Sequence, residues 1–150
     1  MYTIEEFDKE KTKVLKYVIY KKRTEKEVKT KFKSQIEEDL LSDIIKDLKE
    51  NGYIDDEKYV ERAINEFMAL KNLSIKEIKY KLLSKGVPTR ILDEYIEKNT
   101  EELEEYEQKS ANNIALKKSV NMEETEIKQY LMKKGYMEEN IRETLEKLEE

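Results

Sequence analysis

Residues 24–29 of the chain read TEKEVK, and residues 74–79 repeat this pattern as SIKEIK. A looser copy surrounds Ile127. The glutamates Glu27, Glu77 and Glu126 stand 50 and 49 residues apart. Self-similarity at a fixed period of this length is typical of proteins built from tandem structural repeats. The period therefore predicts three repeat units in the 150 residues of the chain.

Apolar residues follow this repeat in a common register. Their spacing of three to five residues is typical of the buried faces of helices. The chain has only three glycines and one proline, so few residues interrupt helices. The matching apolar positions are Tyr17, Phe67 and Leu116; Val28, Ile78 and Ile127; Phe32, Leu82 and Leu131; Ile36, Val87 and Tyr136; Leu41, Leu92 and Ile141; and Ile45, Ile96 and Leu145.

These patterns predict an all-α fold for the single chain 1–150, in which three tandem three-helix repeats form an elongated, curved array. The expected units cover approximately residues 10–52, 53–99 and 100–150. Within them we expect helices near 10–21, 25–34, 38–51, 56–71, 75–85, 89–98, 101–119, 124–134 and 138–148.

Capping signals agree with these boundaries. Thr24 with Glu27, and Ser74 with Glu77, have the spacing of capping boxes, in which the hydroxyl and the glutamate satisfy backbone N–H groups at a helix start. Asn121 is the expected cap in the third unit. Three glycines stand where helices must end, because glycine adopts the left-handed conformation freely: Gly52, Gly86 and Gly135.

The residue inventory argues against catalysis. The chain has no histidine and no cysteine, which removes the commonest general base and the thiolate nucleophile. Three isolated glycines cannot build a phosphate-binding loop. The adjacent Asp55 and Asp56 suit a helix start better than an acid–base pair. We therefore expect no enzyme activity, no cofactor and no metal site, and we interpret one set of tyrosines as core residues: Tyr17, Tyr59, Tyr95 and Tyr130.

Charge is distributed unevenly along the chain, whose formal net charge is −5. Residues 9–33 contain eleven basic and three acidic residues, whereas residues 100–150 contain eight basic and fourteen acidic ones. This asymmetry predicts partner contacts in the leading part of the chain. No apolar run approaches the ~20 residues of a membrane span, and no signal pattern opens the chain, so we expect a soluble, cytoplasmic protein.

Four stretches resemble the RecX family when they are taken in order. Residues 14–28 resemble its first helix and the capping box that follows. Residues 51–59, NGYIDDEKY, are similar to its Gly-Tyr-Leu-Asp-Asp stretch. Residues 82–87 and 131–136 resemble paired elements with a leucine at the first position and Lys-Gly before the final residue. The resemblance spans about residues 11–148, and the ordered set is more specific than any single motif.

The resemblance implies a function. RecX proteins are elongated regulators that lie in or cap the groove of a RecA–DNA filament and usually suppress its ATPase, co-protease and strand-exchange activities. A non-catalytic monomer that regulates DNA repair, recombination and the SOS response is therefore expected, with RecA as its partner and weak, salt-dependent contact with single- or double-stranded DNA. The candidate contact residues are Lys21, Lys22, Arg23, Lys29, Lys31, Lys76, Lys79, Lys81 and Lys85.

Two alternatives from other classes stay open. Helical units with basic second helices also resemble DNA readers, so the chain could bind DNA without RecA. A helical adaptor for a peptide or a partner helix would also fit the pattern. The sequence does not decide between inhibition and activation of RecA, or between capping a filament end and filling its groove.

Overall fold

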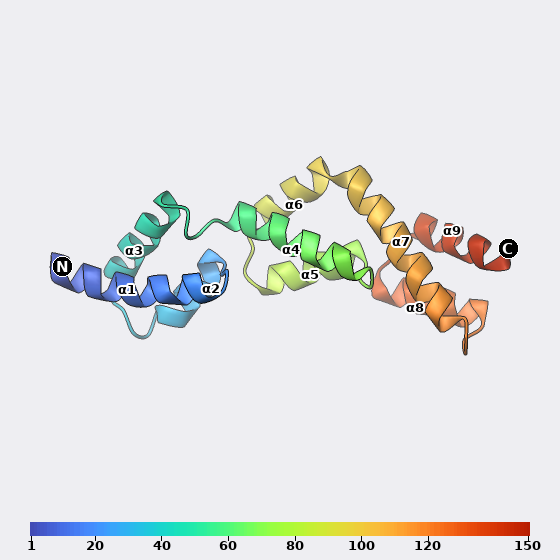
Figure 1. The fold of residues 1–150 in the computed structure, drawn as a ribbon, viewed down its shortest axis with the longest axis horizontal. Helices are drawn as coiled ribbons and strands as arrows, with labels where there is room; N and C mark the ends of the chain where they lie inside the picture. Colours follow the sequence, from blue (N-terminus) through green and yellow to red (C-terminus); the bar gives the residue numbers. More distant parts are fainter.

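The computed structural model describes residues 1–150, which form helices and no strand, as the all-α prediction requires (Figure 1). The helices are α1 (Ile4–Tyr20), α2 (Glu25–Phe32), α3 (Glu38–Glu50), α4 (Asp56–Leu70), α5 (Ile75–Ser84), α6 (Thr89–Lys98), α7 (Thr100–Lys118), α8 (Glu124–Lys134) and α9 (Glu138–Glu149). Their ends lie within two residues of the predicted ones, except that α1 begins six residues early. Thr3 explains this start, because its hydroxyl accepts a hydrogen bond from the Glu6 N–H at 3.1 Å.

Consecutive helices group in threes, which we call the first triplet (α1–α3), the second triplet (α4–α6) and the third triplet (α7–α9). Figure 1 shows the triplets following one another along the long axis of the molecule, with the chain termini at opposite ends. The array is therefore elongated.

Three separate clusters of buried apolar side chains lie along the array. The first cluster contains 11 residues and comes entirely from residues 14–54. The second contains 8 residues, two of which, Leu103 and Tyr106, belong to α7 of the third triplet. The third contains 7 residues from α7, α8, α9 and the turn before α9. The second and third triplets thus share a helix across their junction, whereas the first triplet has a core of its own.

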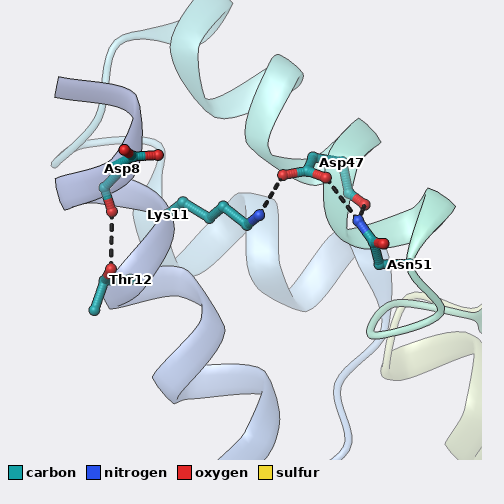
Figure 2. Close-up of polar contacts among 5 residues, drawn as sticks. All are labelled: Asp8, Lys11, Thr12, Asp47 and Asn51. Atoms are coloured by element: carbon teal, nitrogen blue, oxygen red, sulfur yellow. Dashed lines mark hydrogen bonds and ion pairs between the residues drawn. The ribbon is translucent and has the colours of Figure 1, made fainter. Parts of the chain in front are cut away.

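Polar contacts tie α1 to α3 inside the first triplet (Figure 2). The Lys11 ammonium lies 2.6 Å from the Asp47 carboxylate, which also accepts a hydrogen bond from the Asn51 side-chain amide at 2.7 Å. On α1 itself, the Thr12 hydroxyl donates to the Asp8 carbonyl oxygen at 2.8 Å. Because both ionic side chains are about one third exposed or less, the pair contributes at most about 1 kcal/mol.

Two details differ from the sequence-based expectations. Asn121 is wrong as a cap, because Glu123 occupies the N-cap of α8 and its N–H donates to the Glu126 carboxylate at 3.3 Å. The structure also adds two tyrosines to the predicted core set. Tyr106 and Tyr136 are the buried ones, each 5% exposed. The four expected in the core are half-buried and pack against the three clusters: Tyr17, Tyr59, Tyr95 and Tyr130.

None of the helices is both long enough and apolar enough to cross a membrane.

Candidate partner-binding surface

The second helices of the triplets, α2, α5 and α8, meet end to end at the junctions. The Thr24 hydroxyl, at the start of α2, donates to the Lys85 carbonyl oxygen at the end of α5, at 2.7 Å. The Ser74 hydroxyl, at the start of α5, donates to the Lys134 carbonyl oxygen at the end of α8, also at 2.7 Å. Thr24 and Ser74 are fully buried. One bond type therefore links both pairs of neighbouring triplets.

Each of these hydroxyls satisfies two helix ends at once. Besides donating to a carbonyl, the Thr24 oxygen accepts from the Glu27 N–H at 3.1 Å and the Ser74 oxygen accepts from the Glu77 N–H at 3.0 Å. The last carbonyls of a helix and its first N–H groups have no partner within that helix. The positive end of one helix also faces the negative end of the next, which is electrostatically favourable.

Glycine allows this close approach of the second helices. A Cβ atom on Gly86 would lie 2.6 Å from the Cβ of Lys26, and a Cβ atom on Gly135 would lie 2.8 Å from the Cδ of Lys76. Both distances are too short for carbon atoms in van der Waals contact. These glycines therefore end helices, as the sequence indicated, and also leave room for the neighbouring triplet.

A lysine-lined groove lies at each junction. The first groove, of about 370 Å³, is lined by Lys26, Lys31 and Lys85 together with Tyr17 and Gly86. The second groove, of about 550 Å³, has four lysines in its lining: Lys76, Lys81, Lys133 and Lys134. Ser84 lines both grooves, so they adjoin on α5.

Positive charge dominates both grooves. None of their seven lysines forms an ion pair with a carboxylate. The acidic residues among the lining side chains are Glu27 and Glu77, and the carboxylate of each accepts the N–H of its own capping residue at 3.0 Å. We refer to the pair of sites as the lysine grooves. Their charge suits a polyanion such as a phosphate backbone.

The predicted contact residues divide into those that line the lysine grooves and those that do not. Lys31 and Lys85 line the first groove, and Lys76 and Lys81 line the second. Lys21 and Lys22 are exposed where α1 ends, outside both grooves.

The remaining three predicted contact residues have partners within the chain, as does the groove residue Lys31, whose ammonium lies 5.8 Å from the centroid of the Tyr17 ring. Lys29 pairs with Glu25 and Lys79 pairs with Asp93, each at 2.9 Å. Arg23 is half-buried, and its guanidinium lies over the Tyr17 ring, 4.1 Å from the centroid. That cation–π contact holds the Arg23 side chain against the first triplet.

The sequence-based list omitted three groove lysines, Lys26, Lys133 and Lys134. It also omitted Tyr80, which is 74% exposed in the second groove. A signal for these residues was present in the sequence, since Gly86 and Gly135 both follow a lysine near the end of a second helix. Interpreted only as helix ends, these glycines gave no indication of the junctions between triplets.

A buried carboxyl group lies at the junction between the second and third triplets. Glu107 of α7 is fully buried, and it accepts hydrogen bonds from the Met137 N–H at 3.1 Å and the Asn140 side-chain amide at 3.3 Å. Burial raises the pKa of Glu107 above its ordinary value, although these hydrogen bonds oppose the shift. No group of three or more acidic side chains in residues 1–150 is arranged to hold a metal ion.

Comparisons with known proteins agree with this architecture. No protein-family model matches the sequence. Regulatory protein RecX of Staphylococcus carnosus is 30% identical over 139 residues, which cover 90% of this chain and 52% of that protein. Regulatory protein RecX of Clostridium acetobutylicum is 28% identical over 148 residues, which cover 92% of this chain and 68% of that protein. The chain spans about half the length of several curated relatives that it matches.

Solved structures extend the likeness to the fold. The crystal structure of RecX from Lactobacillus salivarius matches with a TM-score of 0.81 at 28% identity, over 98% of this chain and 99% of that one. A second crystal structure of a regulatory protein RecX, at 23% identity, has a TM-score of 0.79 over 92% of this chain and 72% of that one, which supports the fold. Together with the curated relatives, these matches show that the chain belongs to the RecX family of regulatory proteins.

Proposed function

We propose that this chain acts as a monomer in the cytoplasm, binds a RecA–DNA filament through the lysine grooves, and lowers the filament's ATP hydrolysis. Co-protease activity and strand exchange would fall with it, so that the chain regulates DNA repair, recombination and the SOS response. The observation that carries the proposal is the repetition of one groove at two consecutive junctions. The RecX resemblance supplies the identity of the partner.

Repetition matters because a filament is itself a repeated structure. Two equivalent basic grooves on an elongated body can contact a regularly spaced polyanion at successive points. Each lysine–phosphate contact is weak and screened by salt, but several on one body add to a useful affinity. A body that bridges neighbouring filament subunits would restrain their relative motion. Binding energy alone then suffices for regulation.

The test is a titration of the chain against RecA turning over ATP on single-stranded DNA. We expect the steady-state rate to fall. Inhibition well below one copy per RecA subunit would indicate capping of filament ends, whereas groove filling would require nearly stoichiometric amounts. Unchanged turnover, filament length and binding at saturating protein would refute the assignment to RecA.

Charge-reversal variants connect the activity to the lysine grooves. Lys31→Glu with Lys85→Glu removes two cations from the first groove, and Lys81→Glu with Lys133→Glu removes two from the second. Both double variants should inhibit much less than the wild type. The matched control, Lys46→Glu with Lys98→Glu, changes the net charge equally at exposed sites outside both grooves. If the control loses as much inhibition as the groove variants, net charge rather than the grooves is responsible.

Binding to DNA without RecA is a second candidate, and Tyr80 is the observation that favours it. The ring is 74% exposed among the lysines of the second groove, where an unpaired base could stack on it. Binding to bare single-stranded DNA should then weaken steeply with salt, with a log–log slope of about −0.7 per neutralised phosphate. Tyr80→Ala should weaken it further, by about 1–3 kcal/mol. Weak, salt-insensitive binding would exclude this candidate.

A further inference from the structure

A cationic cavity separate from the lysine grooves lies between α7 and α9, beside the end of α4. Its volume is about 440 Å³, within the range of small-ligand sites. Lys71, Lys109 and Lys147 line it, and none of its lining residues is acidic. None of these lysines forms an ion pair within the chain. Three uncompensated cations thus converge in the part of the chain that is richest in glutamate.

A fixed hydrogen-bond donor lies in the wall of this cavity. The Asn112 side-chain oxygen accepts from the Gln108 amide at 3.0 Å and from the Thr144 hydroxyl at 2.7 Å. The Gln108 amide shares its two protons among Asn112, the Thr144 oxygen at 2.8 Å and the Asn140 carbonyl oxygen at 3.1 Å, and the Thr144 proton is directed to Asn112. These bonds set the orientation of the Asn112 amide. Its Nδ2 group therefore has no protein acceptor and remains available to a ligand in the cavity.

Lys71, one of the residues that line the cavity, holds an unusual backbone conformation. Its φ of +49° makes it the single non-glycine residue in the chain with a positive φ. The Asn113 side chain stabilises this turn by donating to the Lys71 carbonyl oxygen at 3.1 Å. A left-handed conformation is strained for a residue with a Cβ, and glycine would avoid most of that strain. Strain of this kind is a reason to look for a function of the side chain.

Leucine side chains complete the cavity. Leu116 is 67% exposed, although Tyr17 and Phe67, at the matching positions of the other triplets, are half-buried against their cores. Leu148 of α9 is half-buried and also lines the cavity. Exposed leucine beside lysine suits a ligand with an aliphatic group next to its negative charge. A sugar–phosphate backbone would leave the leucines without a partner.

We propose that this cavity binds an acidic peptide segment of a partner protein. A glutamate or aspartate carboxylate accepts from the Asn112 amide between the ammonium groups of the three lysines. A neighbouring aliphatic side chain of the peptide packs on Leu116 and Leu148. The cavity shares no lining residue with the lysine grooves, so this inference is independent of the proposed function.

The probe is a fluorescein-labelled octapeptide composed of glutamate and leucine, with both ends blocked, titrated with the full chain by fluorescence anisotropy. The key variant is Asn112→Asp, which keeps the oxygen that Gln108 and Thr144 bind but replaces the free donor with a negatively charged oxygen. Because a hydrogen bond to a charged group is worth about 1.5–3 kcal/mol, we expect Asn112→Asp to weaken binding at least about tenfold. Circular dichroism checks that the fold is retained.

Lys71→Gly separates binding from stability. This variant removes one cation and relieves the positive-φ strain, so the affinity for the peptide should fall while the melting temperature stays equal or rises. The double variant Lys109→Gln with Lys147→Gln should also bind more weakly. Lys128→Gln, an exposed lysine outside the cavity, is the matched control and should bind like the wild type.

Several outcomes would overturn the proposal. They are the absence of saturable binding up to about 1 mM peptide, equal affinity of the cavity variants and the wild type, and equal binding of a peptide with glutamine in place of glutamate. Stronger binding of a single-stranded oligonucleotide that is abolished by the same variants would assign the cavity to nucleic acid instead.

Discussion

Replacing Ser74 with alanine tests whether one hydroxyl joins two triplets. In the structure this fully buried oxygen accepts from the Glu77 N–H at 3.0 Å and donates to the Lys134 carbonyl at 2.7 Å. Losing the cap at the start of α5 should cost about 1 kcal/mol. Leaving the Lys134 carbonyl without a donor at a buried junction should cost a further 1–3 kcal/mol, as a rough estimate. We therefore expect Ser74→Ala to lower the free energy of unfolding by about 2–4 kcal/mol.

Thr3→Ala is the matched control for this experiment. The Thr3 hydroxyl caps α1 by accepting from the Glu6 N–H at 3.1 Å, but the residue is exposed and makes no bond to another triplet. Its loss should cost about 1 kcal/mol or less. Urea unfolding followed by far-ultraviolet circular dichroism measures both variants, and hydrogen exchange should show faster opening of α8 in Ser74→Ala alone. Equal losses for Ser74→Ala and Thr3→Ala would refute the reasoning.

Three further variants test other parts of the structure. Gly86→Ala places a Cβ 2.6 Å from Lys26, whereas Gly52→Ala meets nothing within 4 Å. Both variants carry the cost of an alanine in the left-handed conformation, so Gly86→Ala should lower the melting temperature more than Gly52→Ala does. The pKa of Glu107 is raised in the folded chain, so the wild type loses stability as pH rises from the unfolded pKa of this carboxyl through its folded pKa. The stability of Glu107→Gln relative to the wild type should therefore rise over that pH range. A difference in urea titrations that does not change with pH would contradict this. Lys11→Met should cost less than about 1 kcal/mol in the same assay, because the pair with Asp47 is partly exposed.

Helix positions could be predicted because local and periodic signals coincide. The capping boxes at Thr24 and Ser74 and the apolar register fix where the second helices begin and which face is buried. The start of α1 was missed because its first two turns are strongly charged, and the Thr3 cap preceding Phe7 was overlooked. Glu123 was missed as a cap because the expected hydroxyl or amide is absent there.

The surface was less predictable than the fold. The pair of Lys29 with Glu25 has the four-residue spacing of neighbours on one helix and could have been predicted from the sequence. The pair of Lys79 with Asp93 joins α5 to α6 and follows from three-dimensional packing. Arg23 lies six residues after Tyr17, beyond the three- and four-residue neighbours of a helix, so its contact with the ring depends on the turn between α1 and α2. The lysine grooves are distinguished by lysines that have no carboxylate partner, and identifying such lysines requires the three-dimensional position of every acidic side chain.

The junction residues explain why the repeat is visible in the sequence at all. A helix cap alone can be serine, threonine, aspartate or asparagine. At Thr24 and Ser74 the side chain must also donate to a carbonyl, and an ionised aspartate has no proton to donate. Glu123 fits the same argument from the other side, because it is exposed and no helix end faces it within residues 1–150. A carboxylate is acceptable there. A hydroxyl at the start of a second helix therefore marks a position that joins two triplets, whereas a carboxylate marks one that only begins a helix.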